Sequence, residues 1–393
     1  MAQTLTQIAQ TLKANNKKVQ LIYAFNGSGK TRLSRDFKEL VAPKNADEEE
    51  ESKIKIMYYN AFTEDLFYWD NDLDYDTNRK LIIQPNNYTN WVLVEQGQES
   101  NITRHFQRYT NEKLTPKFNE QYTIKDKYDN DVIIPAYSEV RFSFQRGNDE
   151  NPELVKISKG EESSFIWSIF YSLLAQTIIV LNEAEVGKRE TDQFNDLQYV
   201  FIDDPVSSLD DNHLIELAIN IAELIKSSQS PTLKFIITTH SPLFYNVLYS
   251  ELGVKEGNIL SKNDDNTFDL IPKKGDSNLS FSYHLFLKQT IQKAIDNSAV
   301  KKYHFTLLRN LYEKTASFLG YPRWAELLPD DKQTYYNRVI QFTSHSLISN
   351  ETVAEPTDPE KATVKFLLDH LTTNYNYWKE EKAKVEEPVV TEV

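Results

Sequence analysis

Residues 24–31 read AFNGSGKT, directly after the apolar run VQLIY at residues 19–23 and directly before a segment with helical periodicity. A glycine-rich turn between a buried strand and a helix is the setting of a phosphate-binding loop, whose backbone N–H groups surround phosphate oxygens. Lys30 would neutralise the terminal phosphates of a nucleotide, and the Thr31 hydroxyl would bind the magnesium ion. The expected nucleotide-binding residues of this loop are Asn26, Gly27, Ser28, Gly29, Lys30 and Thr31.

Two further strands end in residues that suit nucleotide hydrolysis. YVFIDDP, residues 199–205, ends in Asp203 and Asp204. Asp203 would hold magnesium through water, and Asp204 lies where a general base orients the attacking water. FIITTHS, residues 235–241, ends in His240, which matches a histidine that senses the terminal phosphate.

Two shorter motifs complete the pattern of an ABC-type nucleoside triphosphatase. ISKGEES, residues 157–163, resembles the ABC signature, and SSLD, residues 207–210, resembles the D-loop. Ser158, Gly160 and the following helix N-terminus would face the γ-phosphate held by a neighbouring protomer. The pattern therefore predicts at least a head-to-tail dimer, and a tetramer remains open.

Two departures from the usual motifs predict slow turnover. Asp204 replaces a common glutamate, and Lys159 replaces a signature glycine. The shorter aspartate side chain holds its carboxylate farther from the attacking water, so we expect a turnover below ~10 s⁻¹. The glutamine loop of ABC proteins cannot be located securely, and YNAFTEDLF at residues 59–67 occupies roughly its place.

The whole pattern predicts an α/β fold with a largely parallel sheet, in which a P-loop ABC-type NTPase domain is followed by a mainly helical domain. We place the domains at residues 1–265 and 266–393. Predicted buried strands cover residues 19–24, 54–59, 199–202 and 235–238, and an antiparallel strand covers 139–144. Predicted helices cover residues 31–40, 162–181, 212–226, 283–297, 301–319, 331–343 and 359–387.

Composition indicates a soluble protein of the cytoplasm. The chain has no cysteine, which excludes disulfides, zinc-thiolate sites and cysteine nucleophiles. Its first residues lack the apolar core of a signal peptide. The uncharged run at residues 165–181 is at the low limit for a membrane span and contains several polar residues, so we interpret it as a buried helix.

Charge points to the C-terminal part as the place for nucleic acid. The chain carries a net charge of −14, which argues against general polyanion binding. Residues 270–345 nevertheless contain 11 Lys and Arg against 6 Asp and Glu, a local balance of +5.

Three C-terminal residues fit metal-free RNA cleavage. Arg309 and Glu313 are four residues apart in a helical pattern and therefore share a face, and His345 follows a predicted helix. A Glu/His pair can supply the base for the 2′-OH and the acid for the leaving 5′-oxygen, and an arginine can hold the phosphate. Products would carry a 2′,3′-cyclic phosphate and a 5′-OH, and either residue could be the base. An ordinary surface ion pair and a surface histidine are the alternative.

Nearly the whole chain resembles the PrrC-type anticodon nucleases, which cut lysine tRNA. The resemblance rests on phrases such as SKGEES, FIITTHSPLFYNVL, YHFTLLRNLYEKTASFLGYP and FTSHS. It assigns the catalytic roles to Arg309, Glu313 and His345, and anticodon recognition to the region around Asp276. A carboxylate there could pair with the cationic wobble-base side chain of lysine tRNA.

The resemblance also implies a regulated defence toxin. The nuclease would be silenced by a type I DNA restriction–modification complex and released by a phage-encoded peptide. ATP or GTP with Mg²⁺ would serve the NTPase site, dTTP would act as an effector nucleotide, and RNA cleavage would need no cofactor.

Two rival functions are disfavoured by the sequence. A DNA-end-sensing ABC ATPase would carry long coiled coils between loop and signature, but only about 125 residues without sustained heptads lie there. A metal-dependent DNA nuclease would need clustered carboxylates, and the C-terminal acids are scattered.

Overall fold

The computed structural model describes residues 2–43, 54–60, 63, 65–72, 78–126, 128–144, 154–205, 209–263, 265–274, 283–343 and 356–377. The chain divides into two compact units after Gly275. The boundary predicted after residue 265 falls inside a hairpin, because Glu256–Lys262 (β12) and Phe268–Lys274 (β13) pair along their whole length. This pairing keeps β13 in the first unit.

A six-stranded sheet, ordered β13-β12-β1-β11-β10-β2, is the centre of the first unit. Its remaining strands are β1 (Val19–Tyr23), β2 (Ile56–Tyr59), β10 (Tyr199–Asp203) and β11 (Lys234–Thr239). All neighbours are parallel except β12 and β13. Parallel strands buried on both faces read as continuous apolar runs, which is why these four could be predicted. The α/β fold class is confirmed.

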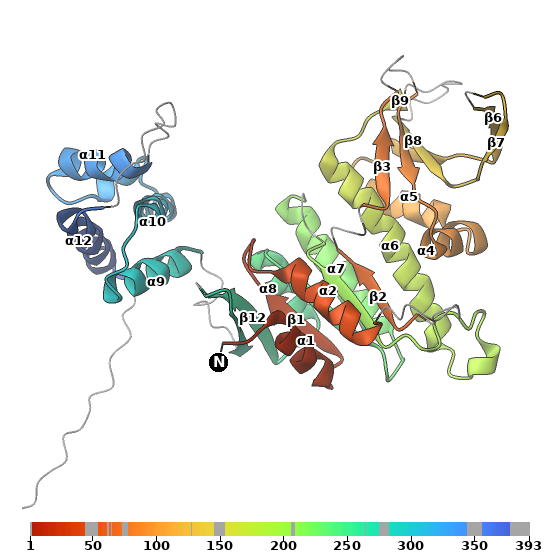
Figure 1. Cartoon of the computed structure of the whole chain (residues 1–393), viewed down its shortest axis with the longest axis horizontal. Helices are drawn as coiled ribbons and strands as arrows, with labels where there is room; N and C mark the ends of the chain where they lie inside the picture. Colours follow the sequence, from red (N-terminus) through yellow and green to blue (C-terminus); the bar gives the residue numbers. More distant parts are fainter. Residues whose placement is uncertain are drawn as a thin grey trace, which may run out of the picture. The chain divides into compact units, whose positions relative to one another are not determined.

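Helices cover both faces of this sheet (Figure 1). Helices α1 (Leu5–Ala14) and α2 (Lys30–Val41) pack on one face through a shared core that includes Ile8, Leu33 and Phe37. Helices α7 (Asp211–Ser227) and α8 (Pro242–Glu251) pack together, and α8 also contacts β1 and β11. This layering fixes the strand ends that carry the predicted nucleotide motifs.

An antiparallel sheet with order β3-β4-β8-β5 forms a second part of the same unit, and β9 pairs with β8. β8 coincides with the predicted antiparallel strand. The strands are β3 (Phe67–Asp70), β4 (Lys80–Ile83), β5 (Leu114–Phe118), β8 (Glu139–Phe144), β9 (Leu154–Val155) and the separate hairpin β6 (Tyr122–Lys125) and β7 (Asp131–Ile134). The accompanying helices are α4 (Asn87–Asn90), η1 (Trp91–Glu95) and α5 (Glu99–Arg108), while the short helix η2 (Val186–Lys188) lies between α6 and β10 in the chain.

The uncharged run lies in helix α6 (Lys159–Asn182). Of the helices that the structure describes, this one alone is long and apolar enough to cross a membrane. However, 78% of its most apolar 18-residue stretch is buried inside the protein. Trp167 and Phe170 pack against the ring of Tyr59, with ring centroids 5.0 and 5.1 Å away. This burial fits a core helix of a soluble protein.

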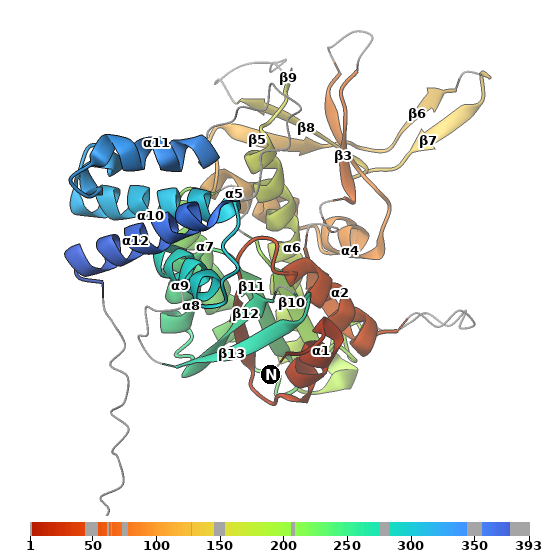
Figure 2. The same cartoon turned by 60° about the vertical axis from the view of Figure 1, so that its left-hand side comes forward.

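The described part of the second unit is helical. Its elements are α9 (Tyr283–Asp296), α10 (Tyr303–Leu319), η4 (Trp324–Leu327), α11 (Lys332–Thr343) and α12 (Asp358–Asn374). Helix α10 contacts α9, α11 and α12 around one apolar core (Figure 2). Helix α12 ends at Asn374, well before the predicted end at residue 387. Asn376 has a φ of 53°, and this left-handed conformation cannot continue a right-handed helix.

Candidate functional site

Two glycines with positive φ form the turn between β1 and α2. Gly27 has a φ of 81° and Gly29 a φ of 88°, a region that other residues adopt only at a cost. Gly29 is also the N-cap of α2, so no side chain caps the first N–H groups of this helix. An uncapped helix N-terminus that follows a glycine turn is suited to bind an anion.

Alanine substitutions should separate the roles of the two glycines. Gly27→Ala should lower the unfolding free energy by about 1–2 kcal/mol through backbone strain alone, because the new methyl meets nothing within 4 Å. Gly29→Ala should cost more, since its methyl would lie 3.2 Å from Phe268 and 3.4 Å from Leu5. Urea unfolding of both variants measures the difference. Equal costs, or the reverse order, would contradict the described loop.

Lys30 is buried and bends back over its own loop. Its Nζ donates to the carbonyl oxygens of Ala24 and Phe25, at 3.3 and 3.4 Å, and to Asn26 Oδ1 at 3.2 Å. The same Nζ lies 3.4 Å from Asp204 Oδ2. An ammonium ion held among carbonyl oxygens inside a phosphate-binding turn is placed to meet phosphate oxygens.

The ends of β10 and β11 hold Asp203 beside the start of α2. Thr31 Oγ1 donates to Asp203 Oδ2 at 2.7 Å, and the Thr238 hydroxyl donates to the other carboxylate oxygen. Burial raises the pKa of Asp203, although both hydroxyl hydrogen bonds oppose this shift. A buried carboxylate beside a hydroxyl offers the oxygen ligands that Mg²⁺ prefers, so Thr31 and Asp203 fit a magnesium ion.

Asp204 has a strained backbone, and the side chains of His240 and Lys30 both approach its carboxylate. Its φ is 52°, unusual for a residue other than glycine and common at functional sites. Nδ1 of His240 lies 2.7 Å from both oxygens of this carboxylate, and Lys30 approaches it as well. Burial opposes ionisation of Asp204, but the His240 hydrogen bond and the Lys30 charge prevail and lower its pKa. The structure thus brings Lys30, Asp203, Asp204 and His240 together at one edge of the sheet.

The lowered pKa of Asp204 predicts a specific pH dependence. A carboxyl group whose pKa is lower in the folded state stabilises the fold above its unfolded pKa, near 4, and loses this contribution as pH falls through the folded pKa. The stability difference between wild type and Asp204→Asn should therefore be larger at pH 5 than at pH 3. Urea unfolding at both pH values tests this prediction. Both proteins contain Asp203, so the comparison isolates Asp204. A difference that grows with acid would contradict the described pairing.

The predicted signature lies at the N-terminus of α6. Ser158 is the N-cap, and its hydroxyl accepts from Glu161 N in a reciprocal capping box, while Gly160 lies in the first turn. Ser158 is exposed and therefore accessible from outside this chain. Lys159, in place of a signature glycine, pairs with buried Glu162 at 2.8 Å.

The D-loop prediction falls partly outside the described residues, which omit Ser207 and Ser208. Its last residue, Asp210, N-caps α7 by accepting from His213 N at 3.0 Å. Leu209 and Pro205 line a small cavity together with Gly160, so the D-loop and the signature helix are neighbours in one protomer.

The structure identifies Asn60 as a further candidate residue of this site, one that sequence reasoning missed. It follows β2, the neighbour of the β10 strand that carries Asp203, and it is fully buried. Its Nδ2 donates to Ser34 Oγ, one turn beyond Thr31 on α2, at 3.4 Å. A polar residue directly after a buried strand was the available signal, but only the strand order brings it to α2.

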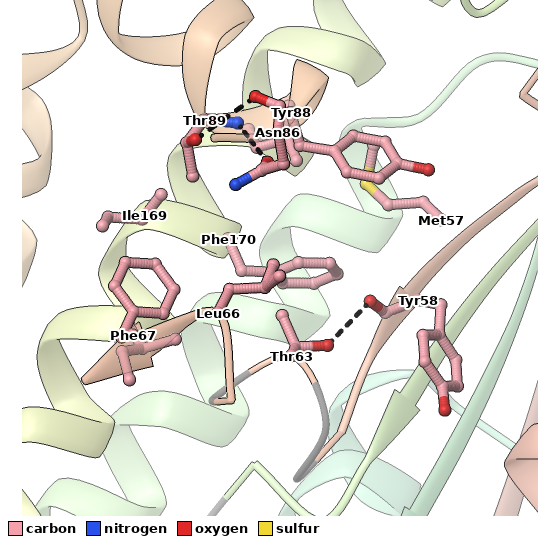
Figure 3. A pocket seen from close by; sticks show the side chains of 12 residues that line it. Met57, Tyr58, Thr63, Leu66, Phe67, Asn86, Tyr88, Thr89, Ile169 and Phe170 are labelled. Atoms are coloured by element: carbon pink, nitrogen blue, oxygen red, sulfur yellow. Dashed lines mark hydrogen bonds between the residues drawn. The ribbon is translucent and has the colours of Figure 1, made fainter. Parts of the chain in front are cut away.

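The segment after β2 also borders a cavity of about 40 Å³ against α6 (Figure 3). Leu66 and Phe67 from this segment and Ile169 and Phe170 from α6 surround the cavity, and Thr63 Oγ1 donates to the Tyr58 carbonyl at 3.2 Å. Thr63, Leu66 and Phe67 therefore lie beside the helix whose N-terminus carries the predicted signature.

In the second unit, Arg309 and Glu313 form the predicted pair. Arg309 Nε donates to Glu313 Oε1 at 2.8 Å, and their side chains are 34% and 39% exposed. Leu308, Leu311 and Tyr312 of the same helix pack into the helical core. The pair is therefore accessible to a substrate on a helix fixed by packing. His345 and Asp276 lie outside the described residues.

Comparison with known proteins gives one strong match. A curated protein from Escherichia coli named "Anticodon nuclease" is 59% identical over an alignment of 409 residues, which covers 97% of this chain and 99% of that protein. No protein-family model matches.

Solved structures match only weakly. An SMC head bound to the C-winged helix domain of ScpA gives a TM-score of 0.31 with 11% identity, covering 67% of this chain and 92% of that one. The SMC head domain from Thermotoga maritima gives a TM-score of 0.26 with 11% identity, covering 66% and 92%.

Proposed function

The chain belongs to the anticodon nuclease family, and on this premise we propose that it cuts lysine tRNA in the anticodon loop, 5′ of the wobble base, under control of an ABC-type NTPase head. The observation that carries the proposal is the Arg309–Glu313 pair, accessible on one face of α10.

The proposed cleavage is a transesterification that uses no metal. A base removes the 2′-OH proton, the 2′-oxygen forms a bond to phosphorus, and the bond from phosphorus to the 5′-oxygen breaks as an acid protonates that oxygen. Glu313 and His345 take these two roles in either order. Arg309 holds the phosphate and stabilises its growing negative charge.

The first unit binds ATP or GTP in this proposal. Lys30 and the α2 N-terminus hold the phosphates, and Thr31 and Asp203 hold Mg²⁺, which neutralises phosphate charge. Asp204 orients the attacking water, and His240 keeps the Asp204 carboxylate ionised and in place. Ser158 and Gly160 complete the site of a neighbouring protomer, so the working form is at least a head-to-tail dimer.

Family membership supports the remaining parts of the proposal. Asp276 recognises the cationic wobble-base side chain, and dTTP acts as an effector nucleotide. A type I DNA restriction–modification complex silences the nuclease in the cytoplasm, and a phage-encoded peptide releases it as an antiviral toxin. No membrane is involved.

The ends of the RNA products test the proposed chemistry. Purified chain, activated with nucleotide and then treated with EDTA, should continue to cut lysine tRNA and leave 5′-OH and 2′,3′-cyclic phosphate ends. Products with 5′-phosphate ends, formed only while the metal is present, would instead indicate a metal-dependent nuclease.

A further inference from the structure

A groove in the helical unit begins at Glu313, and its other lining residues take no part in the cleavage proposed above. Its first hollow has a volume of about 440 Å³, in the range of small-molecule sites, and its lining includes Glu313, Tyr321, Arg323, Trp324 and Tyr336. We call this hollow and its continuation the Trp324 groove.

An aromatic wall bounds the groove. Trp324 and Tyr336 are stacked, with ring centroids 5.2 Å apart and planes 22° apart. Trp324 also packs edge-on against Tyr312, which is buried and donates its hydroxyl to the Leu367 carbonyl at 2.8 Å. These contacts fix the wall to the core, so it needs little ordering before it binds a planar ligand.

A local turn brings this wall to Glu313. Gly320 has a φ of 80° and ends α10, and the chain then reverses into η4, which starts at Trp324. Buried Leu327 anchors η4 in the same apolar core. The residues after α10 are thereby held beside the helix face that carries Glu313.

The groove continues into a second hollow of about 510 Å³ that shares Arg323, Ala325 and Tyr336 with the first. Lys332 lines this continuation, and so does the carboxylate-bearing Glu326. Arg323 and Lys332 are exposed, and neither makes an ion pair with another residue in the described part of the chain. Two cations and two carboxylates give little net charge, so stacking must provide much of the affinity for a ligand.

We propose that the Trp324 groove binds a nucleotide of single-stranded RNA next to the scissile phosphate. An unpaired base stacks on the Trp324–Tyr336 wall, and a backbone phosphate pairs with Arg323. Unpaired loop bases are the part of RNA that aromatic side chains can reach, whereas paired bases are already stacked within a helix. This inference rests on the proposed nuclease function, and it adds a substrate-binding role for residues that do not perform the chemistry.

The test measures binding of lysine tRNA to the full chain carrying Glu313→Gln, in which cleavage is expected to be slow enough for binding to be measured. In this parent, Arg323→Ala should reduce the slope of log affinity against log salt by about one, because one phosphate contact is lost. Trp324→Leu should weaken binding roughly tenfold at every salt concentration without changing the slope. Tyr336→Phe keeps the stacked ring and should bind like the parent.

Matched controls lie on α12 of the same unit. Lys365→Ala removes an exposed positive charge that lines neither hollow, and Phe366→Leu removes an aromatic ring stacked on Tyr335. Both should bind like the parent. Thermal melting checks that Trp324→Leu folds, and Arg323→Ala tests the groove without touching the core.

Unchanged affinity and slope in both Arg323→Ala and Trp324→Leu would overturn the groove proposal, and if the wild type still cleaved lysine tRNA, the proposed function would stand. A wild type that neither bound nor cleaved any tRNA would overturn both. Equal weakening by Lys365→Ala would also contradict the groove, since it would show general charge attraction instead.

Discussion

Glu313→Gln should slow RNA cleavage by about 10²–10⁴-fold, because the variant can no longer exchange the proton that general acid–base catalysis requires. Glutamine keeps the shape of the side chain and can still contact Arg309. The Arg309–Glu313 pair is partly exposed and of the i,i+4 kind, so its loss should change the unfolding free energy by only about 0.3–0.5 kcal/mol. Cleavage rate and stability should therefore respond very differently.

The control for Glu313→Gln is Asp369→Asn, which removes an exposed carboxylate from α12 of the same unit. Single-turnover cleavage of lysine tRNA measures both variants, and their melting temperatures show whether the fold is intact. If Glu313→Gln cut RNA as fast as Asp369→Asn, the pair would be an ordinary surface ion pair and the catalytic assignment would be wrong.

Lys30→Met should weaken nucleotide binding roughly 10- to 150-fold, the range expected when a charged hydrogen-bond donor to phosphate is lost. The buried ammonium ion already lies among the loop carbonyl oxygens and beside Asp204, so the methionine side chain fills the space but cannot bind phosphate. The rate of nucleotide hydrolysis should fall together with nucleotide affinity. If the head controls the nuclease, cleavage by this variant should no longer respond to added nucleotide.

Lys38→Met is the matched control, because Lys38 is an exposed lysine two turns farther along α2. Titration with a fluorescent ATP or GTP analogue measures affinity in both variants. Equal affinities would show that the turn after β1 does not hold the phosphates. Normal affinity in the control, with cleavage by Lys30→Met still responsive to nucleotide, would contradict control by the head.

Most of the candidate nucleotide site could be predicted because its signals are local. A buried strand, a glycine turn and a helix start are adjacent in the chain around Lys30. Asp203 and Asp204 come at the end of the apolar run YVFI, and His240 follows the buried strand FIITT. Parallel strands in one sheet bring such ends to a common edge. The left-handed backbone of Asp204 has no comparable signal, because aspartate adopts that conformation more often than most residues but still only in a minority of cases.

Features that depend on packing between distant segments could not be predicted. Asn60 reaches α2 only because β2 pairs with β10, and β13 joins the first unit only because it pairs with β12. The Trp324 groove likewise requires η4 to turn back beside α10 and α11 to bring Tyr336 against Trp324. In the sequence these aromatic residues are indistinguishable from other partly buried ones.

The most direct test of the central claim is to map 5′-OH ends across total tRNA from cells that express wild type or His345→Ala. We expect a single new break in the anticodon loop of lysine tRNA, present with wild type and absent with His345→Ala. A wild type that is toxic to the cells and yet leaves every tRNA intact would contradict it.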